Sequence, residues 1–387
     1  MYRANIKIKI IIAALTVLFF ILTVSAKDNI NDITDTTNAD IEDVLGGMRD
    51  IIPESVSIPD ELFDGMLSAE DITTATGIDY IFGRLKDMLK EAFFPAAGFL
   101  AVIMSTVLVS SVIGVISRDI GDGVMSASVS MITCLCLALY IITAEERLVG
   151  DISTFAHTVT TFTTAMVPMI AGLLAAAANT STAAVTSSGL LLFSAAVEYA
   201  VTYIFIPIFR IGLSLAVISS VAGEETGVGG ICEFIKKTFS WLAAGAATLF
   251  ATVLSYQTAI AASADTAAAR GLKYTFGSAV PVVGGALSDA LRTATAGLSV
   301  IKNGAGTIGI VVLLLLTCPL IITIVYTMAS LGIASLTAGM LGCKREASLL
   351  SEIRAMMGFA AAIVVLTAFV FIFALALFMS TAPAITS

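Results

Sequence analysis

Ionisable side chains inside apolar runs are the first residues of this sequence that could do chemistry. Glu198 lies well inside the apolar run 184–205, and Arg210 lies just after Pro207 in the next run. Ionisable groups in membrane helices are costly, and they mark substrate sites, ion pathways or proton relays. The two side chains could pair across Pro207 and offset two buried charges. Alternatively, Arg210 reaches the membrane interface and Glu198 faces a neighbouring helix.

Other catalytic patterns are missing from the sequence. His157 is the single histidine, so no Ser-His-Asp or HExxH arrangement exists, and we interpret it as an interface residue. No GxxxxGK[ST] motif is present, which argues against ATP hydrolysis by this chain. We expect no cofactor. The cysteines form no CxxC pair and are expected to be buried apolar residues, not metal or disulfide sites; they are Cys134, Cys136, Cys232, Cys318 and Cys343.

The composition of the chain is that of an integral membrane protein. Of its 387 residues, 58% are hydrophobic and 13% are charged, and the mean hydropathy is +0.99. Globular domains carry about a quarter charged residues, so this chain has too few to cover a water-facing surface. This excludes a cytosolic enzyme, a disordered protein and a collagen-like fibre.

Residues 1–26 predict a signal peptide. Three basic residues precede an uncharged run over 10–22, which at 13 residues is short for a span. Small residues follow, and cleavage is predicted between Ala26 and Lys27. The alternative is an uncleaved first helix. Both interpretations place residue 27 outside the cytoplasm, because the positively charged flank stays inside.

Residues 27–91 form a strongly acidic extracytoplasmic segment, with 16 acidic and 5 basic side chains. Three short amphipathic helical patterns occur in it, and the last runs directly into the first apolar run. The segment is either a small solvated cap, a set of helices on the membrane surface, or a docking surface for another protein. Its charge argues against nucleic acid as a partner.

Residues 92–387 predict an all-α polytopic membrane domain of about eight helices, with a range of seven to nine. Alternating ten-residue segments are missing, which argues against a transmembrane β-barrel. The predicted spans are Phe93–Ile116, Val124–Thr143, Thr160–Ala178, Ala184–Phe205, Ile206–Ala222, Phe239–Ser263, Gly306–Leu341 and Ala355–Met379.

Residues 263–305 are the least regular part of this domain. Pro281, Gly284 and Gly285 are expected to break a helix, and Asp289 and Arg292 follow on one polar side. Irregular backbone at membrane depth is tolerated only against protein or a water-filled cavity. We therefore expect either a surface amphipathic helix or a re-entrant element that lines a cavity.

Two rows of small residues recur every four positions. Such faces let membrane helices approach closely, so they predict either a tight bundle or assembly with other subunits. The rows are Ala243, Ala247 and Ala251, and Ser330, Ala334 and Ala338.

The layout and two segments carry a family resemblance. A signal peptide and an acidic segment precede GSAVPVVGGALSDA at 277–290 and VIKNGAGTIGIVVLLLLTCPLI at 300–321. With these features the chain resembles the stage III sporulation protein AE family of endospore-forming Firmicutes. The resemblance covers nearly the whole chain but contains no catalytic motif, so no catalytic residue can be assigned from it.

The resemblance implies a place in a multi-protein complex of the mother-cell membrane. Its implied partners are the other stage III sporulation membrane proteins, including a separate ATPase. The complex would meet a forespore membrane protein across the intermembrane space and form a channel or secretion-like apparatus. The acidic segment would then face that space.

Three hypotheses follow from the sequence. The first is a non-enzymatic membrane subunit of this channel complex, with residues 281–292 lining or sealing a conduit. The second is a stand-alone transporter for a small solute that uses Glu198 and Arg210. The third is a scaffold without a conduit, whose helices recruit other subunits.

Overall fold

The computed structural model describes residues 78–119, 123–176, 180–222, 228–279 and 284–380. Within these ranges the chain is all-helical, apart from a short turn at 341–343. The predicted signal peptide, with its cleavage site at Ala26 and Lys27, and the acidic segment up to residue 77 lie outside the described residues. The helices are α4 (Ile78–Asp119), α5 (Gly123–Ala176), α6 (Thr180–Ala200), the π-helical turn η2 (Val201–Phe205), α7 (Ile206–Ala222), α8 (Val228–Ala279), α9 (Gly284–Met340) and α10 (Lys344–Ser380).

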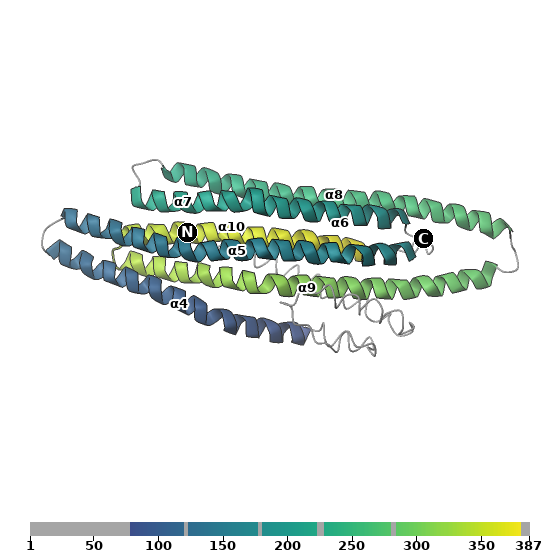
Figure 1. The fold of residues 1–387 in the computed structure, drawn as a ribbon, viewed down its shortest axis with the longest axis horizontal. Coiled ribbons are helices and arrows are strands. Elements are labelled where there is room, and N and C mark those ends of the chain that lie inside the picture. Colours follow the sequence, from purple (N-terminus) through teal and green to yellow (C-terminus); the bar gives the residue numbers. More distant parts are fainter. Residues whose placement is uncertain (1–77, 120–122, 177–179, 223–227, 280–283, 381–387) are drawn as a thin grey trace.

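The helices form one elongated antiparallel bundle (Figure 1). The α4–α5, α7–α8 and α9–α10 connections lie at one end, and the α5–α6 and α8–α9 connections lie at the other. Because α6, η2 and α7 follow one another along a single rod, the bundle consists of six rods. The prediction of an all-α fold is confirmed for the described residues.

Each of the six rods has a helix long and apolar enough to cross a membrane. The rods exceed what a bilayer needs, however. α5 has 54 residues, which at 1.5 Å per residue is about 80 Å, whereas the hydrocarbon core is about 30 Å thick. The bundle is therefore more than twice as long as the apolar layer it would cross.

The predicted separation of the spans Val124–Thr143 and Thr160–Ala178 is wrong, because α5 runs without a break from Gly123 to Ala176. The charged cluster 145–151 suggested an end to the second span. Leu148, Val149 and Ile152 nevertheless continue the buried helical face through this cluster. Since no proline stands there and its residues favour helix, the chain has no reason to turn.

The predicted separation at Pro207 is also wrong, because the rod runs on through it. Pro207 has no N–H to donate and its ring crowds the carbonyl of Tyr203. The turn before it widens to a π-helix, in which the Ile206 N–H donates to the Val201 carbonyl five residues earlier. Such π turns accommodate an irregularity without ending the helix. Two pairs of predicted spans thus form two rods, and the described residues contain six helices long and apolar enough to cross a membrane.

α10 is the central helix of the bundle. It packs against α5, α6, α7, α8 and α9, and 67% of its most apolar window is buried, against 11% for α8. The largest fully buried side chains come from four rods, which fill the interior together; they are Phe162, Phe209, Phe239, Phe371 and Phe378.

The segment 263–305 is helical on both sides of residues 280–283, which lie outside the described residues. α8 continues to Ala279, and α9 begins at Gly284. These arms of α8 and α9 extend past the ends of α5, α6 and α10 (Figure 1). Whether the segment enters a membrane stays a prediction.

α9 ends in a well-defined C-terminal cap before the turn to α10. Gly342 has a φ of 78°, in the left-handed region that favours glycine. The Cys343 N–H donates to the Ala338 carbonyl at 2.9 Å, and the Gly342 N–H donates to the Gly339 carbonyl at 3.2 Å. This pattern is a Schellman motif, and it lets α10 fold back directly against α9.

We expect Gly342→Val to lower the free energy of unfolding by about 1–2 kcal/mol, because a β-branched residue is strained at positive φ. Thermal unfolding in detergent would measure it. Gly339→Ala is the control, since Gly339 is helical and an added Cβ meets nothing within 4 Å. Equal stability of Gly342→Val and the parent chain would contradict the turn geometry.

Candidate functional site: polar contacts between apolar helices

A buried carboxylate at the start of α10 joins three helices. Glu346 is 1% exposed. Its Oε1 accepts a hydrogen bond from the Ser110 hydroxyl of α4 at 2.6 Å and one from the Thr133 hydroxyl of α5 at 2.9 Å. The Ser130 hydroxyl of α5 lies 3.3 Å from both carboxylate oxygens. These contacts join residues more than 200 positions apart, so they fix the position of α10 relative to α4 and α5.

Local structure explains why Glu346 can be buried there. It lies in the first turn of α10, where the helix dipole favours a negative charge. Ser130 and Thr133 are three residues apart and share one side of α5. Sequence reasoning missed this cluster, because each hydroxyl is a common small residue in an apolar run. Only the acidic residue in the first turn of a helix was a visible signal.

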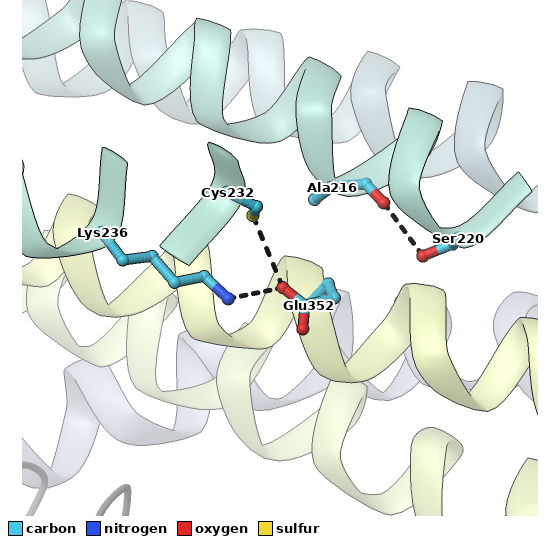
Figure 2. Close-up of polar contacts among 5 residues, drawn as sticks. All are labelled: Ala216, Ser220, Cys232, Lys236 and Glu352. Carbon is cyan, nitrogen blue, oxygen red and sulfur yellow. Dashed lines mark hydrogen bonds and ion pairs between the residues drawn. The ribbon is translucent and has the colours of Figure 1, made fainter. Parts of the chain in front are cut away.

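A second carboxylate of α10 joins it to α8. Figure 2 shows Lys236 and Cys232 of α8 pointing at Glu352. The Lys236 ammonium forms an ion pair with Glu352 Oε2, and the Cys232 thiol donates to the same oxygen at 3.7 Å. Ser220 of α7, nearby in the same view, donates to its own helix at the Ala216 carbonyl at 2.9 Å. Cys232 is buried, so the group joins helices and presents no exposed nucleophile.

Glu198 and Arg210 do not pair with each other. Arg210 binds Glu146 of α5 at 2.7 Å, and Glu198 binds His157 of α5 at 2.9 Å. The predicted pair is therefore wrong in its partners, although both side chains do pair. The cause is the continuous α5, which brings Glu146 and His157 alongside α6 and α7. The interpretation of His157 as an interface residue did not include this contact with Glu198.

The two rows of small residues differ in burial. Ser330, Ala334 and Ala338 are buried, and the Ser330 hydroxyl donates to the Ala96 carbonyl of α4 at 3.5 Å. This row serves packing within the chain. The row on α8 is half-buried: Ala243, Ala247 and Ala251.

α9 and α10 approach each other closely beside the buried row. An added Cβ at Gly332 would lie 3.0 Å from the Arg354 guanidinium, and the Ser335 hydroxyl donates to the Ala347 carbonyl at 2.9 Å. The first three turns of α10 therefore contact α4, α5, α8 and α9 through polar groups.

The candidate conduit residues are described only by their backbone. Gly284, Gly285, Asp289 and Arg292 lie in the first turns of α9, and Pro281 lies outside the described residues. Their role stays a prediction. In the part of the chain that the structure describes, no three His, Cys, Asp or Glu side chains are grouped to hold a metal ion.

Comparison with known proteins places this bundle in a family. Residues 63–382 match the family described as stage III sporulation protein AE. The chain belongs to this family. A stage III sporulation protein AE of Bacillus subtilis (strain 168) is 26% identical over 158 residues. That match covers 41% of this chain and 39% of the relative. No solved structure is significantly similar to the chain. Membership in the stage III sporulation protein AE family implies a role in sporulation.

We expect Thr133→Val to destabilise the chain by about 1.5–3 kcal/mol, because it removes a hydrogen bond to a buried carboxylate while keeping the side-chain volume. Thr143→Val is the matched control, since the exposed Thr143 hydroxyl bonds only its own helix at Leu139. Denaturant unfolding in detergent would compare them. If both variants lost the same stability, the Glu346 cluster would not be a specific tie between helices.

Lys236→Met and Glu352→Gln should be coupled. The two side chains are 26% and 34% exposed, and contacting residues typically show coupling of about 0.5–3 kcal/mol. A double-mutant cycle on unfolding free energies would measure it. The same cycle with Lys237→Met should give no coupling, because Lys237 is exposed on the adjacent helical position. Additive effects at Lys236 and Glu352 would contradict the contact in Figure 2.

Proposed function

We propose that this chain is a non-enzymatic, multi-pass membrane subunit of the channel or secretion-like complex that joins the mother cell to the forespore. Its partners in this proposal are other stage III sporulation membrane proteins, with ATP hydrolysis supplied by a separate subunit. A forespore membrane protein is reached indirectly. The family match over residues 63–382 is the observation that carries the proposal.

The surface of the bundle supports a membrane location. Large apolar side chains on α4, α6, α8 and α9 are exposed, which in water would be unfavourable over so many positions. Lipid or neighbouring subunits would cover them. Examples are Val112, Leu192, Trp241 and Leu249, which are 58%, 69%, 76% and 60% exposed.

Basic residues lie near both ends of the bundle. Arg118, Lys236, Lys344 and Arg345 belong to the helix ends near the three connections at one end (Figure 1). The arms of α8 and α9 at the opposite end carry Arg270, Lys273, Arg292 and Lys302, so the positive-inside rule does not choose between the two ends. The proposed orientation, with residue 78 on the extracytoplasmic side, therefore rests on the predicted signal peptide. The proposed location is the mother-cell membrane that faces the forespore.

The packed interior supports a subunit more than a self-contained pore. Phenylalanine and aliphatic side chains from several rods meet along the axis. A conduit would therefore run between chains, whether copies of this one or other members of the complex. This makes assembly part of the proposed function.

A stand-alone transporter for a small solute is the second candidate. It is favoured by the Glu146–Arg210 and His157–Glu198 pairs, since ionisable groups within apolar helices are typical of substrate or ion pathways. A pure scaffold remains the third. The three differ in whether purified protein moves a solute and in what it binds.

Affinity purification from sporulating cells, after cross-linking, tests the proposal. A tagged copy should recover other stage III sporulation membrane proteins together with the ATPase, identified by mass spectrometry. An unrelated polytopic protein with the same tag is the control. Recovery of this chain alone, with solute flux in liposomes that Glu198→Ala abolishes, would overturn the complex-subunit role in favour of the transporter.

A further inference from the structure

The second half of α5 exposes an unusual surface. Every third or fourth residue from 146 to 175 is exposed, and all of these residues are polar, charged or small. We call this surface the α5 stripe. It consists of Glu146, Arg147, Gly150, Asp151, Thr154, His157, Thr161, Thr164, Pro168, Gly172 and Ala175. Over 30 residues it extends about 44 Å, which exceeds the thickness of the hydrocarbon core.

The rest of the bundle surface differs from this stripe. The exposed large apolar residues of α5 all precede it: Met131, Ile132, Leu135 and Leu139. α4, α6, α7, α8 and α9 also expose large apolar side chains along their length. A lipid-facing helix needs such side chains, and the stripe has none of them.

Charged contacts lie along the stripe. Glu146 and Arg210 are 54% and 52% exposed, and His157 is 72% exposed. An ionised side chain facing the centre of a bilayer costs several kcal/mol, so membrane proteins turn such groups to a water-filled cavity or another protein. Both ends of these pairs therefore disfavour contact with lipid.

The same stretch of α5, and the neighbouring α6, also carry buried polar atoms that have no partner in the described part of the chain. Glu145 Oε2 and Thr163 Oγ1 on α5, and Ser194 Oγ on α6, are buried without a hydrogen-bond partner among the described residues. Buried polar groups are nearly always satisfied, by protein or by ordered water. Water or a polar neighbour would have to satisfy these atoms, whereas a dry apolar contact would leave them unpaired.

The two glycines of the stripe leave its surface open. A Cβ added at Gly150 or Gly172 would meet nothing within 4 Å. These glycines therefore do not serve packing within the chain.

We propose that the α5 stripe forms the wall of a water-filled path between this chain and its neighbours in the assembled complex, and that the path conducts small hydrated solutes. This inference rests on the proposed channel function and adds where the path runs. The path along the second half of α5 is separate from the predicted conduit segment 281–292, whose role stays a prediction.

Cysteine accessibility tests the position of the path. Single cysteines at Thr154, Thr161, Thr164 and Gly172, in a chain whose five native cysteines are replaced, are exposed to a charged, membrane-impermeant methanethiosulfonate. Membranes from sporulating cells supply the assembled complex. Only a thiolate in contact with water reacts quickly, so all four positions should be modified at least about tenfold faster than lipid-facing positions.

The control positions are matched in depth. The His157–Glu198 pair sets the antiparallel register, so Leu192 of α6 lies at the level of Thr164. Leu192→Cys and Leu249→Cys, both outward-facing, should react slowly. Equal rates at Leu192 and Thr164 would overturn the path, because that level would then lie in bulk water. Slow reaction at all stripe positions would also overturn it.

A larger side chain in the α5 stripe provides a second test of the path. Gly172→Leu should reduce spore yield at least about tenfold while the protein stays in the membrane, and Gly245→Leu on the exposed face of α8 should not. A Cβ added at Gly172 or Gly245 would meet nothing within 4 Å. Normal spore yield from Gly172→Leu would contradict the path. If the cross-linked complex is recovered but the stripe cysteines do not react, only this inference is refuted. If no complex is recovered from sporulating cells, the proposed function is refuted.

Discussion

The burial of Glu346 is the constraint on which the rest of the bundle depends. A carboxylate that is 1% exposed must be hydrogen-bonded, and the Ser110, Ser130 and Thr133 hydroxyls do this from two other helices. Only one axial position of α10 keeps these contacts. From there the next turns of α10 reach Lys236 of α8 and approach α9 closely. The first three turns of α10 thus set the register of helices whose apolar faces alone would allow sliding.

Because the interior of the bundle is packed, a path for solutes must lie on its surface. With large apolar side chains along the axis, the bundle offers its neighbours and the lipid two kinds of face. Most of the surface is apolar, whereas the α5 stripe carries only polar, charged or small residues over a length greater than the hydrocarbon core. A subunit with one polar side is suited to enclosing water only together with other subunits. This arrangement agrees with a family whose role is in sporulation and with the proposed assembly.

The sequence was sufficient for the fold class and the family, because the apolar runs and the segments 277–290 and 300–321 are local patterns. The predicted span boundaries were wrong where tertiary packing outweighed a local sequence signal. The charges at 145–151 resembled a loop, but Leu148, Val149 and Ile152 continue a buried face. Pro207 resembled a break, but a π turn absorbs it. These two errors also hid the partners of Glu198 and Arg210, since both partners belong to the uninterrupted α5. The Glu346 cluster has no local pattern beyond an acidic residue in the first turn of α10, because its members are brought together only by folding.

Electron cryo-microscopy of the complex purified from sporulating cells would test the central claim most directly. The account predicts that α5 is one unbroken helix and that its residues 146–175 face a water-filled path bounded by more than one chain. It also predicts that α10 lies at the centre of each bundle with Glu346 against α4 and α5. A map in which residues 144–151 form a loop between two helices, or in which the α5 stripe faces lipid, would contradict it.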